Sequence, residues 1–214
     1  DRAEFKKRGL DIPAVIDFSV STNPFRLSRA EEAYISRAPI YLYPDSDALD
    51  FIERLAQKLS CPMENLVAGS GATELIRAAA AAYLEDGDIA VTLDPTYGEY
   101  KLACQLNGAQ VKEFKLKAGN DFTLDIEAFT DFARRFSPRA IFICNPNNPT
   151  GSYIGREPFQ KILMVFRSTL VVLDEAYLAF TQNTWDSLPF LSYDNLLVIR
   201  SMTKDYGLAG LRLG

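Results

Sequence analysis

The apolar positions of this chain follow two different periods after residue 46. Short continuous apolar runs such as 140–144 are typical of buried strands, and between them apolar residues recur every three or four positions, as on one face of a helix. Ser46 or Asp47 is the expected N-cap of the first helix, and Asn107-Gly108 ends the third. The runs predict strands over 65–69, 89–93, 111–116, 140–144, 170–173 and 196–200, and the helical spacing predicts helices over 49–59, 73–84, 97–106, 126–136 and 157–167.

Strands and helices alternate along this part of the chain, and their order determines the expected fold. A β-α-β-α order favours a mostly parallel sheet with helices on both faces. We therefore predict a three-layer α/β/α large domain over residues 46–214, in which the apolar run at 210–214 begins one more strand. Residues 1–45 lack this periodicity and are interrupted by prolines, which predicts an irregular N-terminal arm that lies on another surface.

Composition narrows the classes of partner. The chain has 214 residues, of which 48% are hydrophobic, and a formal net charge of −5. This size and apolar content suffice for a substantial core. The acidic balance argues against a nucleic-acid-binding surface, and no apolar run approaches the ~20 residues that a membrane-spanning helix needs. We therefore expect neither a nucleic-acid nor a membrane partner.

The chain contains no histidine, and this excludes several mechanisms. Neither a Ser-His-Asp nor a Cys-His nucleophile system can form, and no metal can be held by histidine. The three cysteines, Cys61, Cys104 and Cys144, have no metal-binding or redox spacing, so we expect no metal site and assign Cys144 to the core. Their odd number, and the lack of a recognisable signal peptide, suit a reduced cytoplasmic protein. Acid–base chemistry must then use Lys, Tyr, Asp, Glu or a cofactor.

Polar side chains follow three of the predicted strands. Asn148 comes shortly after 140–144, Asp174 directly after 170–173, and Lys204 shortly after 196–200. Ligands of open α/β sheets bind at the carboxyl ends of the strands, so these side chains are expected to meet there. A lysine beside an acid and hydroxyl groups suggests a Schiff base with pyridoxal 5'-phosphate (PLP), because burial and cationic neighbours lower the pKa of such an amine.

Each neighbour of Lys204 then has a candidate role. PLP withdraws electrons while its ring nitrogen is protonated, and Asp174 is the expected partner of that nitrogen, although it could instead cap the next segment. Asn148 and Tyr177 could hydrogen-bond the phenolic oxygen of the cofactor. Tyr97 could stack on the ring, or it could be an aromatic core residue of a helix.

A glycine-containing turn offers a site for the phosphate. The segment Gly69-Ser-Gly-Ala-Thr-Glu74 joins a predicted strand to a helix, whose first free N–H groups can donate to an anion. It matches neither a dinucleotide fingerprint, because Glu74 replaces the third glycine, nor a P-loop, and an ordinary tight turn is the alternative. The predicted phosphate-binding residues are Ala72, Thr73, Ser201, Thr203 and Arg212.

Taken together, these segments resemble fold-type I PLP-dependent enzymes, the class I/II aminotransferases. The resemblance rests on Asn145-Pro-Asn-Asn-Pro-Thr-Gly151, Asp174-Glu-Ala-Tyr177 and Ser201-x-Thr-Lys204 with Arg212 eight residues later, and it runs from about Asp17 to Gly214. Histidinol-phosphate aminotransferase is similar through GLAGLRLG, PTYGEY and a Tyr-Pro-Asp turn. Threonine-phosphate decarboxylase is similar through Asp-Phe-Ser, Asn-Pro, LYPD and RSMTK.

The resemblance implies roles that the residues alone do not. Lys204 would carry the Schiff base and act in catalysis with Asp174 and Tyr177. Tyr43 matches a tyrosine that reaches the phosphate from the other subunit, which implies a homodimer with shared active sites. Asn23 matches a substrate-binding residue, but Ser21 stands where both groups commonly carry a second asparagine.

Family members also continue beyond the Lys204 segment. The resemblance implies that the run near Leu211 is an antiparallel strand of the large domain and that a small C-terminal domain, absent from this chain, follows. We therefore expect the 214 residues to be a fragment of a longer enzyme.

Three functions fit the resemblance. The expected function is a cytoplasmic aminotransferase of amino-acid metabolism that acts on a small, possibly phosphorylated, amino compound. A decarboxylase of a phosphorylated amino acid would use the same residues with a different substrate orientation. A PLP-fold sensor of a transcription regulator would need a basic DNA-binding region, which residues 1–45 do not provide.

Overall fold

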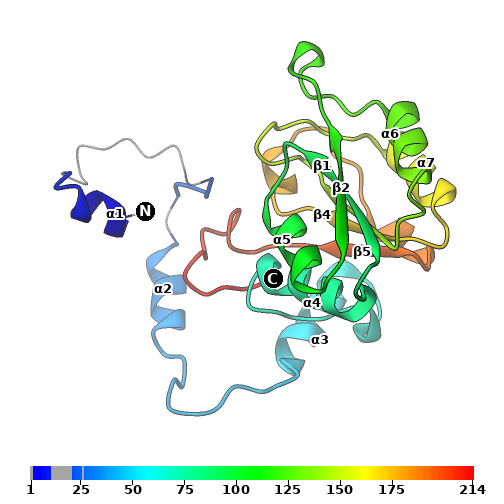
Figure 1. The fold of residues 1–214 in the computed structure, drawn as a ribbon. Helices are drawn as coiled ribbons and strands as arrows, with labels where there is room; N and C mark the ends of the chain where they lie inside the picture. The colour runs from blue at the N-terminus through cyan, green and yellow to red at the C-terminus, as the bar shows by residue number, and fades with distance from the viewer. Residues whose placement is uncertain (1, 11–20, 26) are drawn as a thin grey trace.

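A parallel sheet of five strands forms the centre of the molecule (Figure 1). The computed structural model describes residues 2–10, 21–25 and 27–214, so the Asp-Phe-Ser motif at 17–19 lies outside the described residues. The order in the sheet is β2-β1-β3-β4-β5, and each neighbouring pair is parallel. The strands are β1 (Ile89–Asp94), β2 (Gln110–Lys115), β3 (Ala140–Cys144), β4 (Leu170–Asp174) and β5 (Leu196–Ile199).

The strand order reverses direction at β1. From β1 the chain moves to one side to form β2, and it returns to the other side to form β3. Loops that leave β1 and β3 at their carboxyl ends therefore diverge, and ligands of open α/β sheets bind in the crevice at such a point.

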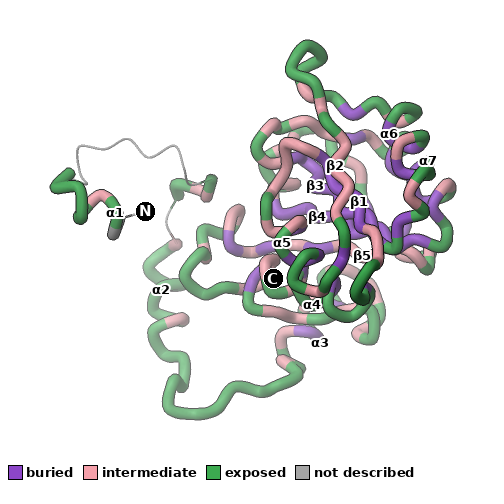
Figure 2. Tube along the Cα trace, viewed as in Figure 1, coloured by how far each residue is buried: buried purple, intermediate pink, exposed green. Residues whose placement is uncertain are grey.

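Helices cover both faces of the sheet, as the alternating pattern predicts. Alternate residues of β3 face opposite layers, because side chains in a strand have a period of two. Ala140 and Phe142 pack with α4 (Ala72–Tyr83) and α5 (Glu99–Leu106). Ile141 and Ile143 pack with α6 (Ile126–Arg134) and α7 (Arg156–Val165). Figure 2 shows this buried core along the strands, and the three-layer prediction is confirmed.

The first helix of the domain, α3 (Leu49–Leu59), begins where the pattern predicts, but its cap is a different residue. Ala48 is the N-cap residue, with a left-handed φ of 50°, and neither Ser46 nor Asp47 caps the helix. The Asp45 carboxylate instead accepts hydrogen bonds from the Leu49 and Asp47 N–H groups at 2.7 and 3.1 Å. The left-handed turn at Ala48 brings this carboxylate over the first helical turn.

The N-terminal segment is less irregular than its sequence pattern predicts. It contains α1 (Arg2–Lys7) and α2 (Arg29–Ile35), which Figure 1 shows extending away from the sheet. Ser28 and Glu31 form a complete capping box at the start of α2. The Ser-x-x-Glu spacing is a sequence signal for a helix N-terminus, and it identifies this helix where apolar periodicity does not.

The prediction of a strand over 65–69 is wrong, because the structure has no strand there. The short 3₁₀ helix η2 (Met63–Asn65) occupies its start, and residues 66–69 are extended without a ladder. Gly69 and Gly214 exchange two backbone hydrogen bonds of 2.9 and 3.1 Å, and Met202 N–H donates to the Leu213 carbonyl. Reciprocal exchange is the pattern of antiparallel neighbours, so residues 213–214 lie between 66–69 and the turn after β5.

Three further 3₁₀ helices, η3 (Ala118–Asn120), η4 (Leu178–Phe180) and η5 (Leu188–Ser192), complete the connections. In the described part of the chain, no helix has the length and apolar character needed to cross a membrane.

Candidate functional site

The carboxyl ends of the strands bring most of the predicted site residues to one edge of the sheet. Asp174 is the last residue of β4, and Lys204 lies in the turn beyond β5. The Lys204 ammonium nitrogen lies 5.8 Å from the centre of the Tyr177 ring. The Asn148 amide donates to the Tyr177 hydroxyl at 3.4 Å. Residues at the carboxyl ends of β3, β4 and β5 therefore lie close together, as the parallel sheet predicts.

Asp174 is a buried carboxylate with two fixed donors. It is 2% exposed; its Oδ2 accepts from the Tyr100 hydroxyl at 2.7 Å, and its Oδ1 accepts from the Ala176 N–H at 2.9 Å. Burial raises the pKa of Asp174, while Tyr100, Ala176 and the Lys204 charge act in the opposite direction. The bond to Ala176 caps the following turn, which was the alternative role, and Oδ2 is held by the Tyr100 hydroxyl.

Arg212 lies against the first turn of α4. Gly71 precedes α4 with a φ of +81°, and a Cβ atom there would stand 2.9 Å from Arg212 Nη2. The guanidinium therefore adjoins the helix N-terminus, where the free N–H groups near Ala72 and Thr73 favour an anion. A cation and a helix N-terminus at one place form a phosphate-binding arrangement.

Two hydroxyl groups complete the candidate phosphate site. The Ser201 and Thr203 side chains are buried, and their oxygens lie 2.6 Å apart. The Met202 N–H donates to the Leu213 carbonyl, so the turn that carries these hydroxyls lies beside the segment that carries Arg212.

The sequence pattern predicted that Tyr97 begins a helix, but Tyr97 lies outside it. Helix α5 begins two residues later, at Glu99, and Tyr97 lies half-buried in the turn after β1. Its hydroxyl lies 3.3 Å from Thr73 Oγ1, and its ring meets the Tyr100 ring edge-on with centroids 5.6 Å apart. This places Tyr97 between the helix that bears the phosphate residues and the carboxylate of β4.

Two further predicted site residues, Tyr43 and Asn23, lie on the N-terminal segment. Tyr43 lies on the N-terminal arm with its side chain fully exposed to solvent. Asn23 lies beside the Lys204 segment: its N–H donates to the Lys204 carbonyl at 2.8 Å, and its side-chain amide donates to the Asp205 carbonyl at 2.7 Å. Its Oδ1 accepts from the Phe25 N–H, so Asn23 ties the arm to the turn that holds Lys204.

The structure adds three residues that the sequence analysis did not select. The Tyr100 hydroxyl donates to Asp174, and the available signal in the sequence was a second tyrosine three residues after Tyr97. Glu175 is 5% exposed and accepts from Arg200 Nε at 2.9 Å. Burial raises the pKa of Glu175, and the positive charge of Arg200 lowers that pKa in part. The sequence offered one clue to the Glu175–Arg200 ion pair: each of the two charged residues directly adjoins a predicted site residue, Asp174 or Ser201.

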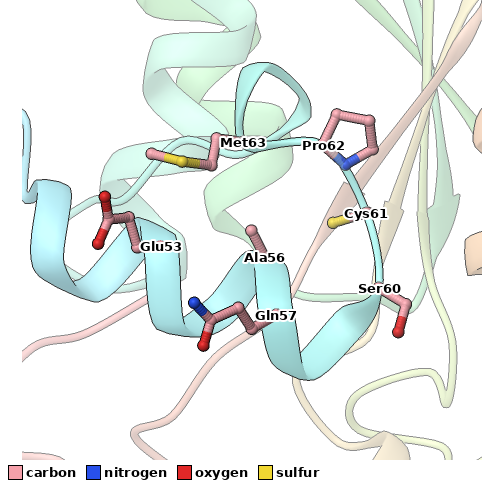
Figure 3. Close-up of a pocket in the computed structure, with 7 residues that line it drawn as sticks. All are labelled: Glu53, Ala56, Gln57, Ser60, Cys61, Pro62 and Met63. Carbon is pink, nitrogen blue, oxygen red and sulfur yellow. The ribbon is translucent and has the colours of Figure 1, made fainter.

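A surface hollow lies elsewhere on the molecule. It has a volume of about 620 Å³ and lies between α3 and η2 (Figure 3), where none of the predicted site residues is found. Its lining residues are Glu53, Ala56, Gln57, Ser60, Cys61, Pro62 and Met63. The edge of the sheet, with its convergent charges and hydroxyls, is therefore the stronger candidate site.

Comparison with known proteins identifies similar chains. Residues 13–214 match the family model described as aminotransferase class I and II. A histidinol-phosphate aminotransferase of Ruminiclostridium cellulolyticum is 32% identical over 208 residues, which cover 94% of this chain and 58% of that protein. The chain thus spans a little over half the length of the curated relatives it matches.

Solved structures of other proteins have the same fold as this chain. The crystal structure of histidinol-phosphate aminotransferase from Sinorhizobium meliloti in complex with pyridoxal-5'-phosphate has a TM-score of 0.87 and 25% identity, covering 99% of this chain and 58% of that one. L-threonine-O-3-phosphate decarboxylase from Porphyromonas gingivalis has a TM-score of 0.81 and 24% identity, covering 94% of this chain and 59% of that one. At that identity, the likeness shows a shared fold alone.

Proposed function

This chain belongs to the class I and II aminotransferases, and on that premise we propose that it is a PLP-dependent aminotransferase of a small phosphorylated amino compound. The observation that carries the proposal is the buried Asp174 carboxylate, which shares one sheet edge with Lys204 and with the Arg212 guanidinium at the start of α4. No two of these charges are neighbours in sequence.

The residues present fit PLP. Asp174 offers a carboxylate to the ring nitrogen, and Lys204 offers an amine to the aldehyde. Arg212, the buried Ser201 and Thr203 hydroxyls and the α4 N-terminus suit a phosphate, and Gly71 provides room that a side chain would fill. When bound, PLP supplies an electron sink that makes a bond at the substrate Cα easier to break.

The side chains of this chain would do the remaining work. We assign Lys204 Nζ two tasks, anchoring the cofactor through a Schiff base and moving the proton at the substrate Cα. Asp174, held by two donors, would keep a proton on the ring nitrogen while its carboxyl group is ionised. Asn148 and Tyr177 hold the phenolic oxygen, and Tyr97 lies where it can cover one face of the ring.

Relatives support transamination over decarboxylation. Histidinol-phosphate aminotransferases of Ruminiclostridium cellulolyticum and Bacillus cereus are 32% and 35% identical to this chain, whereas the threonine-phosphate decarboxylase of Porphyromonas gingivalis, at 24% identity, contributes only its fold. Turnover that requires a keto acid would support the proposal, and release of CO₂ without a keto acid would support the decarboxylase.

We further propose a homodimer with shared sites, in which Tyr43 of residues 1–45 reaches the partner's phosphate and residues 46–214 form the large domain. The supporting observation is the exposed apolar segment 40–43 of the arm. A substrate contact by Asn23 is also part of the proposal. A cytoplasmic location agrees with the three free cysteines.

Intact-protein mass spectrometry after borohydride reduction tests the cofactor and its anchor. We expect one pyridoxyl-phosphate mass increment per chain in the wild type and in Lys112→Ala, which alters a lysine on β2. We expect no increment in Lys204→Ala. An increment that persists in Lys204→Ala, or none in the wild type with added PLP, would contradict the proposed anchor.

A further inference from the structure

Tyr100 is fully buried and lies behind the candidate site, on the first turns of α5. Its ring stacks on Phe142 of β3, with centroids 5.9 Å apart and planes inclined by 24°, and it meets Tyr97 edge-on. These contacts from two sides fix the phenol ring, so its hydroxyl has one direction in which to point. That direction is Asp174 Oδ2, at 2.7 Å.

The hydrogen bond has a fixed donor. Burial raises the pKa of Tyr100 well above its ordinary value, and the neighbouring Asp174 and Cys144 act in the same direction, so the phenol keeps its proton. Cys144, at the end of β3, also keeps its proton, because burial raises its pKa to about 12, and its thiol donates to the Pro146 carbonyl. Tyr100 can therefore act only as a donor to the carboxylate.

The Asp174 carboxylate has few other sources of stabilisation. Its Oδ1 accepts from the Ala176 N–H of its own turn, and Lys204 supplies a positive charge from the turn after β5. A buried carboxylate with too few donors becomes protonated, and a neutral acid is a poor partner for a pyridinium N–H. Tyr100 donates to one carboxylate oxygen and Ala176 to the other, and these two hydrogen bonds fix the plane of the Asp174 carboxylate.

We propose that Tyr100 is a positioning residue that keeps the Asp174 carboxylate ionised and oriented toward the ring nitrogen of the cofactor. This rests on the proposed function, since it requires PLP at the sheet edge. Tyr97 and Tyr100 leave the same turn, so the segment that covers one face of the ring also holds the acid at its nitrogen. No part of Tyr100 needs to touch the cofactor for this role.

The test is Tyr100→Phe, which retains the ring and its stacking but removes the hydroxyl. Tyr83→Phe, at the exposed end of α4, is the matched control. PLP affinity is measured by absorbance titration of the purified protein, with circular dichroism to verify the fold. We expect Tyr100→Phe to weaken PLP binding about tenfold to a hundredfold, the range for a hydrogen bond to a charged group, and Tyr83→Phe to leave it unchanged.

A PLP analogue in which C–H replaces the ring nitrogen separates positioning from packing. If Tyr100 acts through Asp174, the wild type and Tyr100→Phe should bind this analogue with equal affinity, because the analogue has no N–H for the carboxylate. An equal loss of PLP and analogue affinity in Tyr100→Phe would show a packing role and overturn the proposal. Unchanged PLP affinity would overturn it as well.

The pH dependence of PLP binding gives a second readout. Loss of a donor raises the pKa of Asp174 further, so PLP binding to Tyr100→Phe should fail at a higher pH on the acid side than binding to the wild type. Titrations of PLP itself are common to both proteins and cancel in the difference. Coincident acid limbs would contradict the proposal. A wild type that binds no PLP would instead refute the proposed function, and this inference with it.

Discussion

At the scale of single residues, Gly71 combines an unusual backbone conformation with a neighbouring charge. Its φ of +81° strains any other residue, and an added Cβ would stand 2.9 Å from Arg212 Nη2. The flexible arginine would have to move away from the start of α4, where it is expected to hold the phosphate.

We therefore expect Gly71→Ala to weaken PLP binding about tenfold to a hundredfold, through the lost charged contact. Gly98→Ala is the control, because Gly98 has a φ of −63° and an added Cβ would have no neighbour within 4 Å. Absorbance titration measures both variants. Equal affinities of the two variants would indicate that the Gly71–Arg212 contact does not serve phosphate binding.

At the scale of elements, an ion pair between a buried glutamate and a partly exposed arginine joins the ends of β4 and β5. Glu175 follows Asp174, and Arg200 follows β5; the arginine also lies 3.7 Å from the Asp186 carboxylate. The two strand ends carry Asp174 and the turn with Lys204. The pair therefore aligns the two elements from which the acid and the amine of the site emerge.

Replacing Arg200 with Met should make stability strongly dependent on pH. Removing the cation leaves a buried carboxylate without its partner, and we expect a loss of about 1–3 kcal/mol in the free energy of unfolding at neutral pH, reduced by the partial exposure of Arg200. The pKa of Glu175 in the folded variant rises further above its unfolded value of 4.5. The folded state then binds more protons than the unfolded state above that pH, so the loss should shrink as pH falls toward 4.5.

Urea unfolding of the wild type and Arg200→Met at several pH values measures this effect. The double variant Glu175→Gln/Arg200→Met is the control, because it lacks the buried charge and should recover much of the stability at neutral pH. A deficit of equal size at every pH would show that Arg200 stabilises the fold by packing alone.

At the scale of the whole molecule, the arm stands apart from the sheet. Ile40, Tyr41, Leu42 and Tyr43 are exposed, with Ile40 at 94%, and α2 contributes no buried residue. Contiguous exposed apolar residues are typical of an interaction surface. A second copy of the chain is the partner that we propose for them.

We expect Ile40→Ser/Leu42→Ser to weaken the dimer by at least about tenfold, because two apolar side chains lose the area they would bury. Sedimentation over a range of protein concentrations measures the dissociation. Val67→Ser, which alters a single apolar residue at 78% exposure outside the arm, is the control. A wild type that sediments as a monomer, or a double variant that dimerises like the control, would contradict the proposed interface.

Local pattern was enough to predict most of the fold and which polar residues meet at one edge of the sheet. The strand over 140–144 and the start of the helix at 49 are as predicted, because continuous apolar runs and helical spacing depend on neighbouring residues. Residues 66–69 were mispredicted as a strand, since their backbone partner Gly214 is remote in sequence. Parallel strands align their carboxyl ends, and for that reason the order of motifs alone placed Asn148, Asp174 and Lys204 together.

The sequence by itself determined the layer order, the edge of the sheet at which the polar residues gather, and which acid and which amine lie there. Only the tertiary structure decided which side chains support them. The bond from Tyr100 to Asp174 and the pair of Arg200 with Glu175 join residues that are far apart along the chain. Side chains separated in this way meet through the packing of α5 on the sheet and the register of β4 with β5, and no local spacing encodes that geometry.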